Sequence, residues 1–175
     1  RDGLHVFHVN LDDTYEGLIE KGELGEKYGI HVMSPSAFPK PEEDFFALVD
    51  TLIKEGIANQ TVFILDTIKK FVDVMDKKAS ATFMQACRRL TGAGGTVIAL
   101  AHINKHKNEE GRGIPGGTSD LLDDCDCAYV MDVVSEEKID GALTRTVEFD
   151  QKKSRGPSAS NAIYSYVKYE DGDYF

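Results

Sequence analysis

Residues 61–67 read TVFILDT, a continuous apolar run that ends in an aspartate and a threonine. Strands of parallel sheets are covered on both faces and have sequences of this kind. Asp66 at the end of the run has two interpretations. It caps the turn that follows, or it lies at the carboxyl edge of a parallel sheet, where open α/β folds bind ligands and where a carboxylate can hold Mg²⁺.

Strand-like and helix-like segments alternate along most of the chain. The predicted strands are 4–11, 30–33, 61–66, 96–102 and 127–134, and the predicted helices are 13–29, 41–56, 79–91 and 119–124. The last third differs, because residues 142–153 and 161–170 alternate like antiparallel strands around a Gly-Pro turn at 156–157. Residues 103–117 are expected to form a loop. The pattern predicts a three-layer α/β fold with a mostly parallel sheet and antiparallel C-terminal strands.

Composition indicates one domain of an ordinary globular protein. The 175 residues include 41% hydrophobic and 29% charged residues, and no apolar run is long enough to cross a membrane. Cys87, Cys125 and Cys127 form no CxxC pair, which predicts buried, reduced thiols in a cytoplasmic protein and argues against zinc. The formal net charge of −10 opposes broad adhesion to nucleic acid, although a local basic segment can still bind it.

Two glycine-rich stretches invite comparison with phosphate-binding loops. GAGG at 92–95 precedes a strand instead of linking a strand to a helix, so we interpret it as a helix end with a tight turn. GIPGG at 113–117 lacks the Lys-Ser/Thr pair that would complete a P-loop. The chain therefore contains no phosphate-binding loop of its own.

Polar side chains follow three of the predicted parallel strands. Asp12 and Asp13 follow the first strand, Asp66 and Thr67 follow the third, and His102 ends the fourth. Each has a structural alternative: Asp13 can cap the helix that it precedes, and His102 can be a partly buried structural histidine. Because parallel strands present their carboxyl ends at one edge, we expect these side chains to form a cluster that holds Mg²⁺, orients water and contacts phosphate.

Four stretches carry a resemblance to a known family: VFILDTIKKF (62–71), TVIALAHINKH (96–106), GIPGGTSDLLDDCDCAYVMD (113–132) and VEFDQKKSRGP (147–157). Their order resembles that in RecA-superfamily ATPases, and in particular in hexameric replicative helicases of the RepA and DnaB type and their phage-encoded relatives. The resemblance implies that Asp66, with Thr67, belongs to the strand whose aspartate holds the Mg²⁺ of bound ATP. It also implies that His102 senses the γ-phosphate.

Two further elements of the family have matching positions. VFHVNLDD at 6–13 resembles the strand that carries the catalytic glutamate, which orients the attacking water. That position falls on Asp12, and Asp13 is the competing candidate. KKSRGP resembles the basic finger that reaches the nucleotide of a neighbouring subunit. Either Lys153 or Arg155 corresponds to that finger, which implies self-assembly into a ring or filament.

The segment NKHKNEEGR at 104–112 is the expected nucleic-acid contact. The resemblance implies DNA as the partner, single-stranded in preference to duplex, and no membrane partner. A solvated loop is the alternative for this segment. The candidate contact residues are Lys105, His106, Lys107 and Arg112.

The resemblance implies an ATP-hydrolysing motor domain, helicase-like and acting on DNA in phage or mobile-element replication, with ATP and Mg²⁺ as cofactors. It spans about residues 4–169 and implies a single RecA-like domain over 1–175. In the family the P-loop and its strand lie just upstream of Gly3, so we expect a chain that begins mid-domain and is inactive alone. Two alternatives stay open: a regulatory or recombination ATPase of the KaiC or RadA kind, and a non-hydrolysing RecA-fold platform for protein binding.

Overall fold

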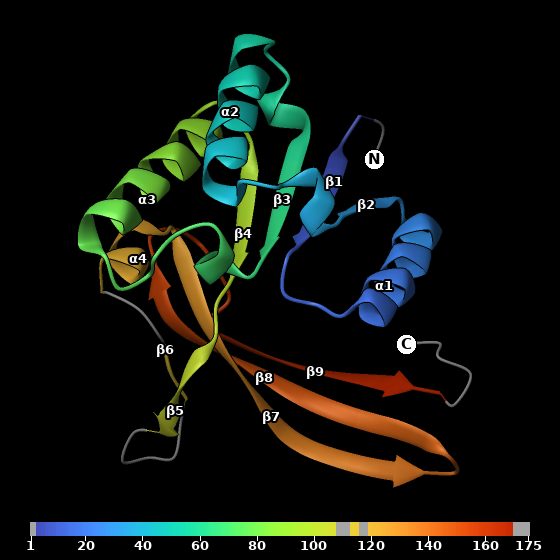
Figure 1. Cartoon of the computed structure of the whole chain (residues 1–175). Helices are drawn as coiled ribbons and strands as arrows, with labels where there is room; N and C mark the ends of the chain where they lie inside the picture. Colours follow the sequence, from blue (N-terminus) through green and yellow to red (C-terminus); the bar gives the residue numbers. More distant parts are fainter. Residues whose placement is uncertain (1–2, 108–112, 116–118, 170–175) are drawn as a thin grey trace. The chain divides into compact units, whose positions relative to one another are not determined.

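The computed structural model describes residues 3–107, 113–115 and 119–169. Side chains are described for these residues except within 104–120. The chain divides into two compact units. Unit 1 comprises residues 1–102 with 117–121, and unit 2 comprises residues 103–116 with 122–175. Figure 1 labels the helices and strands of the chain.

A four-stranded parallel sheet forms the centre of unit 1 (Figure 1). Its strands are β1 (His5–Asn10), β2 (Ile30–Met33), β3 (Thr61–Asp66) and β4 (Thr96–Leu100), in the order β2-β1-β3-β4. β1 pairs with β3 from His5↔Thr61 to Asn10↔Asp66. The apolar run of 61–66 is therefore an interior strand of a parallel sheet, as predicted. The α/β class and the parallel sheet are confirmed, whereas the RecA-like assignment stays a prediction.

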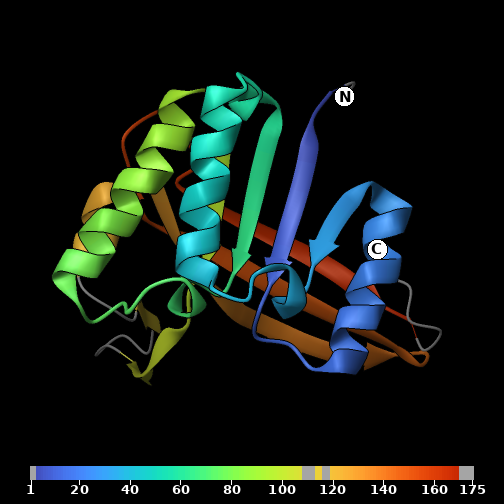
Figure 2. The ribbon, with the colours of Figure 1, turned by 45° about the horizontal axis from the view of Figure 1, so that its top comes forward.

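Three helices connect these strands: α1 (Tyr15–Tyr28), α2 (Pro41–Lys54) and α3 (Lys77–Gly92). α2 has a proline and three acidic residues in its first turn. The proline suits the first helical position, and the negative charges interact favourably with the positive end of the helix dipole. The Asp76 side chain caps α3 by accepting from the backbone N–H groups of Lys78 and Ala79. Short 3₁₀ turns lie at η1 (Pro35–Ala37), η2 (Ala58–Gln60) and η3 (Ile68–Lys70). α2 and α3 lie side by side along one face of the sheet (Figure 2).

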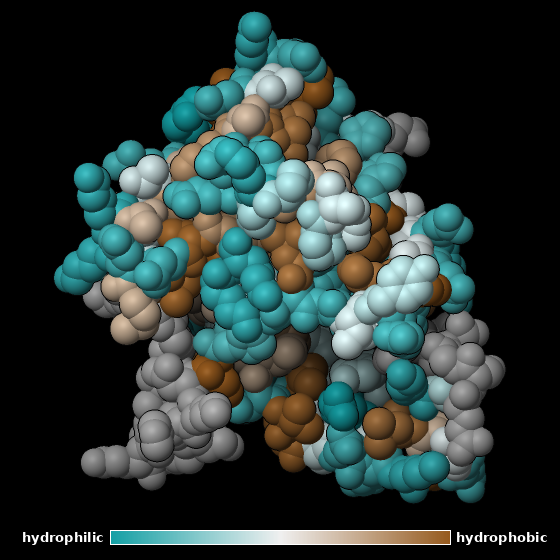
Figure 3. All heavy atoms as spheres, in the orientation of Figure 1, coloured by the Kyte–Doolittle hydropathy of each residue, from teal (hydrophilic) through white to brown (hydrophobic). Residues whose placement is uncertain are grey.

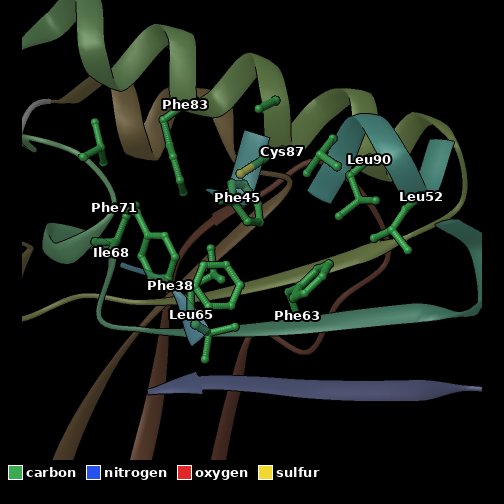
Figure 4. Close-up of a cluster of buried hydrophobic side chains, with 14 of the residues drawn as sticks. Phe38, Phe45, Leu52, Phe63, Leu65, Ile68, Phe71, Phe83, Cys87 and Leu90 are labelled. Atoms are coloured by element: carbon green, nitrogen blue, oxygen red, sulfur yellow. The ribbon is translucent and has the colours of Figure 1, made fainter. Parts of the chain in front are cut away.

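An aromatic cluster fills the space between the sheet and these two helices (Figure 4). β3 alternates, so that Thr61, Phe63 and Leu65 are buried while the residues between them are intermediate. The Phe45 ring stacks on Phe83 at 5.4 Å between centroids, and it meets Phe63 edge-on at 5.9 Å. On the face shown in Figure 3, hydrophilic residues cover much of the surface with apolar ones between them. The buried phenylalanine rings of this cluster contribute to the stability of unit 1.

The glycine-rich stretch 92–95 ends α3 in a tight turn, as predicted. The backbone N–H of Ala93 bonds to carbonyls of the last turn of α3, and Gly94 has a φ of +93°. A Cβ on Gly94 would lie 2.8 Å from the Asn59 Cβ. Both the backbone angle and the close approach to η2 therefore require glycine at this position.

Unit 2 contains β5 (Ile103–Lys107), β6 (Gly113–Pro115), β7 (Cys127–Ile139), β8 (Ala142–Ser154) and β9 (Asn161–Lys168), all in antiparallel pairings. Two expectations are corrected here. Residues 103–117, expected to be a loop, contain the β5–β6 pair. The strand expected at 127–134 is not part of the parallel series. It extends to Ile139 and pairs with β8, because Asp140 and Gly141 both have positive φ and form the two-residue turn that joins such strands.

The three cysteines differ in their exposure to solvent. Cys87, Cys125 and Cys127 are free, but only Cys87 is buried, so the expectation of buried thiols is wrong for Cys127, which is exposed. Among the described residues, no helix combines the length and hydropathy needed to cross a membrane. The expected single domain stays a prediction.

Candidate functional site

The carboxyl ends of β1, β3 and β4 lie at one edge of the parallel sheet. Asp12 follows β1, Asp66 is the last residue of β3, and His102 follows β4. The structure brings the first and third of these together, with His102 Nε2 3.2 Å from Asp12 Oδ2. Their side chains differ in access to solvent, since His102 is 62% exposed and Asp12 25%. His102 is therefore an exposed residue of this edge and not a partly buried structural histidine.

Two lysines of η3 also contact the Asp12 carboxylate. Lys69 Nζ lies 2.9 Å from Oδ2 and Lys70 Nζ lies 2.9 Å from Oδ1. Hydrogen bonds from Lys69, then Lys70 and His102, hold the pKa of Asp12 far below its usual range, and they outweigh the smaller opposing effect of burial. Asp12 is therefore ionised at neutral pH and neutralised by neighbouring cations.

Asp66 and Asp13 are linked through a lysine of α1. Lys21 Nζ lies 2.8 Å from Asp13 Oδ2 and 3.4 Å from Asp66 Oδ2. His8 Nε2 on the neighbouring strand β1 lies 3.2 Å from the same Asp66 oxygen. Burial lowers the pKa of Lys21, but the hydrogen bond and charge of Asp13 and the charge of Asp66 outweigh it, so the pKa is raised. Lys21 therefore stays charged and joins the ends of β1 and β3.

Asp13 does not cap α1, so the structural alternative for this residue is wrong. The N-cap is Thr14, whose Oγ1 accepts from the backbone N–H of Gly17 at 3.2 Å. Asp13 accepts instead from the Thr14 backbone N–H at 2.9 Å and from Asn10 Nδ2 at 3.3 Å. The hydrogen bond from Lys21, followed by that from Thr14, lowers the pKa of Asp13.

Thr67 lies directly after Asp66, and the peptide bond between them is cis. The residue is only 6% exposed, and its Oγ1 is buried with no hydrogen-bond partner in the part of the chain that the structure describes. A buried hydroxyl without a partner is energetically unfavourable, since it gives up its hydrogen bonds to water. Thr67 is therefore a hydroxyl that a bound group or water can satisfy.

Lys153 and Arg155 belong to unit 2, where they hold the end of α4 (Ser119–Asp124). Lys153 Nζ donates to the carbonyl of Leu122 at 2.7 Å and to that of Asp123. Arg155 also donates to the Asp123 carbonyl through its guanidinium. Cations at the carbonyl end of a helix satisfy groups that have no partner within the helix. Both finger candidates thus have a structural role in this chain.

The side chains of all four predicted nucleic-acid contacts lie outside the described ones. The backbone of Lys105, His106 and Lys107 is part of β5. Arg112 lies outside the described residues. The assignment of this segment to DNA binding stays a prediction.

Sequence reasoning missed four residues of this edge: His8, Lys21, Lys69 and Lys70. Lys69 and Lys70 follow the Asp66-Thr67 pair closely in the chain, so a turn after β3 that keeps them near the strand ends was a usable signal. The sequence signal for His8 and Lys21 is weaker. Their proximity to Asp66 depends on strand register and on the position of α1, which the local sequence does not specify.

The acidic residues at this edge could supply only one or two ligands to a magnesium ion. Among the described residues, no group of three or more His, Cys, Asp or Glu side chains could hold a metal ion. Mg²⁺ keeps several waters and commonly uses one or two carboxylates together with substrate phosphates. Asp66 with the unsatisfied hydroxyl of Thr67 beside it fits that mode of binding, in which most ligands come from water and nucleotide.

Comparison of the sequence with protein-family models finds no match, and comparison with curated proteins finds no significant match.

Proposed function

We propose that this chain is part of a RecA-like ATPase motor, helicase-like and acting on DNA in phage or mobile-element replication. The observation that carries the proposal is the meeting of Asp12 and His102 at the carboxyl edge of a parallel sheet whose interior strand ends at Asp66. Ligands of open α/β sheets bind at that edge. The order of the sequence motifs supplies the RecA-like part of the proposal.

The polar residues that follow β1, β3 and β4 have separate roles in this proposal. Asp66 holds the water shell of Mg²⁺, with the Thr67 hydroxyl next to it, and the ion supplies positive charge to the phosphates of ATP. Asp12 or Asp13 orients the attacking water. His102 responds to the γ-phosphate and, within hydrogen-bonding distance of Asp12, links that response to the water-orienting carboxylate. The cradle for the phosphates comes from a P-loop, which this sequence does not contain.

The finger extends the proposal to an assembly. Arg155 or Lys153 of one subunit reaches the nucleotide of the next, where positive charge stabilises the transition state. Arginine offers a planar fork that matches phosphate, whereas lysine offers a mobile point charge. Because both residues contact α4 carbonyls in this chain, their action in a neighbouring site requires them to exchange those contacts for phosphate.

A second candidate is a non-hydrolysing platform for protein binding. One observation favours it: the carboxylates Asp12 and Asp66 are both neutralised by lysines. A regulatory or recombination ATPase of the KaiC or RadA kind is the alternative within the superfamily. It differs in responding to a protein instead of DNA.

The residues encoded just before Arg1 provide the first test. A GxxxxGK[ST] sequence there supports the motor, and its absence supports the platform. In a protein that carries such a loop, Asp66→Asn should reduce ATP turnover by at least about a hundredfold while ATP still binds, because the cradle is unchanged. Asp50→Asn is the matched control, since Asp50 pairs with Arg89 on the surface of unit 1. Equal turnover in both variants would contradict the proposal.

A further inference from the structure

Lys69 and Lys70 leave hydrogen-bonding capacity unused in their contacts with Asp12. Each ammonium group has three donors, and the single carboxylate of Asp12 accepts a hydrogen bond from each of the two lysines. His102 Nε2 also lies 3.2 Å from this carboxylate. Asp12, Lys69 and Lys70 together carry one net positive charge in a chain whose formal net charge is −10. The Lys69–Lys70 pair therefore favours the binding of anions, and in this structure the Asp12 carboxylate is its counter-ion.

The backbone of η3 presents the two lysines on a fixed turn. Ile68 and Phe71, which flank them, are 5% and 1% exposed. The Lys70 backbone N–H donates to the Thr67 carbonyl at 2.9 Å, and that of Phe71 donates to the Ile68 carbonyl at 2.9 Å. The lysine side chains are nevertheless 45% and 40% exposed. The pair is thus fixed at its base, and its side chains are partly exposed to solvent.

A concave region of about 320 Å³ adjoins the pair. Lys69, Lys70, Phe71, Val72 and Asp73 line one side of it, and Lys40, Pro41, Glu42 and Glu43 at the start of α2 line the other. The lining thus holds three lysines and three carboxylates. Lys40 Nζ donates to Glu43 at 2.9 Å, so this third lysine is also held by an internal carboxylate. The volume is large enough for a phosphate chain, and the lysine donors suit one.

We propose that Lys69 and Lys70 form a phosphate-binding pair for which Asp12 is the internal counter-ion, displaced when phosphate binds. The ligand is a phosphate group of a polyphosphate chain or of a nucleic-acid backbone. Displacement also frees the Asp12 carboxylate to orient water. That second consequence rests on the proposed function, whereas phosphate binding does not.

Competition between Asp12 and phosphate gives a distinctive result in titration calorimetry of the full chain with inorganic tripolyphosphate at low salt. Lys69→Ala/Lys70→Ala should weaken binding at least tenfold, whereas Asp12→Asn should tighten it about tenfold, since the competing carboxylate is gone. Lys77→Ala/Lys78→Ala and Asp50→Asn make the same changes of charge elsewhere in unit 1, and each should change affinity less than about twofold. Thermal melting by circular dichroism verifies that every variant is folded.

Three results would overturn the proposal: no tighter binding by Asp12→Asn than by Asp50→Asn, equal losses in the two lysine pairs, or no binding by both the wild type and Asp12→Asn. Competition then identifies the source of the phosphate. Displacement by ATP indicates a nucleotide, displacement by an oligothymidylate indicates a nucleic-acid backbone, and displacement by neither restricts the site to free polyphosphate. The titration measures no turnover, so it stands even if the Asp66→Asn test fails.

Discussion

The Asp12 carboxylate shows how neighbours fix the charge of one residue. It lies among Lys69, Lys70 and His102, and its side chain is three-quarters buried. Burial alone would favour the protonated acid, but the donated hydrogen bonds favour the anion and dominate. The consequence is a carboxylate that contributes to stability through its ionised form.

Stability should therefore depend on pH through Asp12. Folding lowers its pKa, so the contribution is complete at pH above the ordinary Asp value of about 3.9 and is lost as pH falls toward the lower folded value. Asp12→Asn should reduce the free energy of unfolding by about 1 kcal/mol at pH 7. In urea titrations the difference from wild type should be constant between pH 8 and 5 and shrink below about pH 4. A difference that does not change with pH would contradict this account.

The meeting of Asp12 with His102 could be predicted from the sequence, whereas the contacts of Lys21 could not. Each residue of that first pair follows a parallel strand, and the carboxyl ends of such strands share an edge. The contact between Lys21 and Asp66 depends instead on where α1 packs and on which face of the helix Lys21 occupies. Ion pairs between distant segments arise from tertiary packing, which local sequence patterns do not specify.

At the scale of elements, hydrophobic periodicity predicted the helices that bury one face and the strands that are buried on both faces. The interior strand β3 and the amphipathic helix α2 were predicted close to their observed bounds for this reason. The β5–β6 pair was missed because β5 is mostly polar, β6 has only three residues, and the pairing depends on backbone register. The β7–β8 hairpin had a usable signal, the Asp140-Gly141 turn, which specifies antiparallel pairing more directly than the strand residues do.

Two glycines at the end of α3 should respond in opposite ways to the same substitution. Gly94→Ala should lower the free energy of unfolding by about 1–3 kcal/mol, because φ is positive and the new Cβ meets Asn59. Gly92→Ala should be neutral or stabilising by up to about 1 kcal/mol, since a Cβ there meets nothing within 4 Å and alanine favours helix. Denaturant midpoints compare the two variants, and equal effects would refute the assigned turn.

At the scale of the molecule, the residues assigned to one ATPase cycle come from both compact units. Asp12, Asp66 and His102 belong to unit 1, whereas Lys153 and Arg155 belong to unit 2. In the proposed assembly, the first group acts within a subunit and the second acts on its neighbour. This division makes the two groups separable by mixing variant subunits.

Mixing Arg155→Ala with Asp66→Asn subunits should restore ATP turnover in the P-loop-bearing protein, because some interfaces then combine an intact Asp66 with an intact finger. Lys153→Ala tested in parallel identifies which residue is the finger. Lys152→Ala is the control, since Lys152 pairs with Asp150 on the same strand. Melting curves are needed for both finger variants, which also lose contacts to α4 carbonyls. If mixing restores nothing at any ratio, the finger does not act between subunits.

The aromatic cluster of unit 1 also gives this protein an unusual optical signature. The chain contains no tryptophan, seven of its nine phenylalanines lie within residues 1–102, and five of its seven tyrosines lie after residue 121. Phenylalanine fine structure in near-ultraviolet circular dichroism therefore reports mainly on the core between β3, α2 and α3. Tyrosine emission reports mainly on the antiparallel strands. Unfolding of the two units can thus be followed separately without attaching a dye.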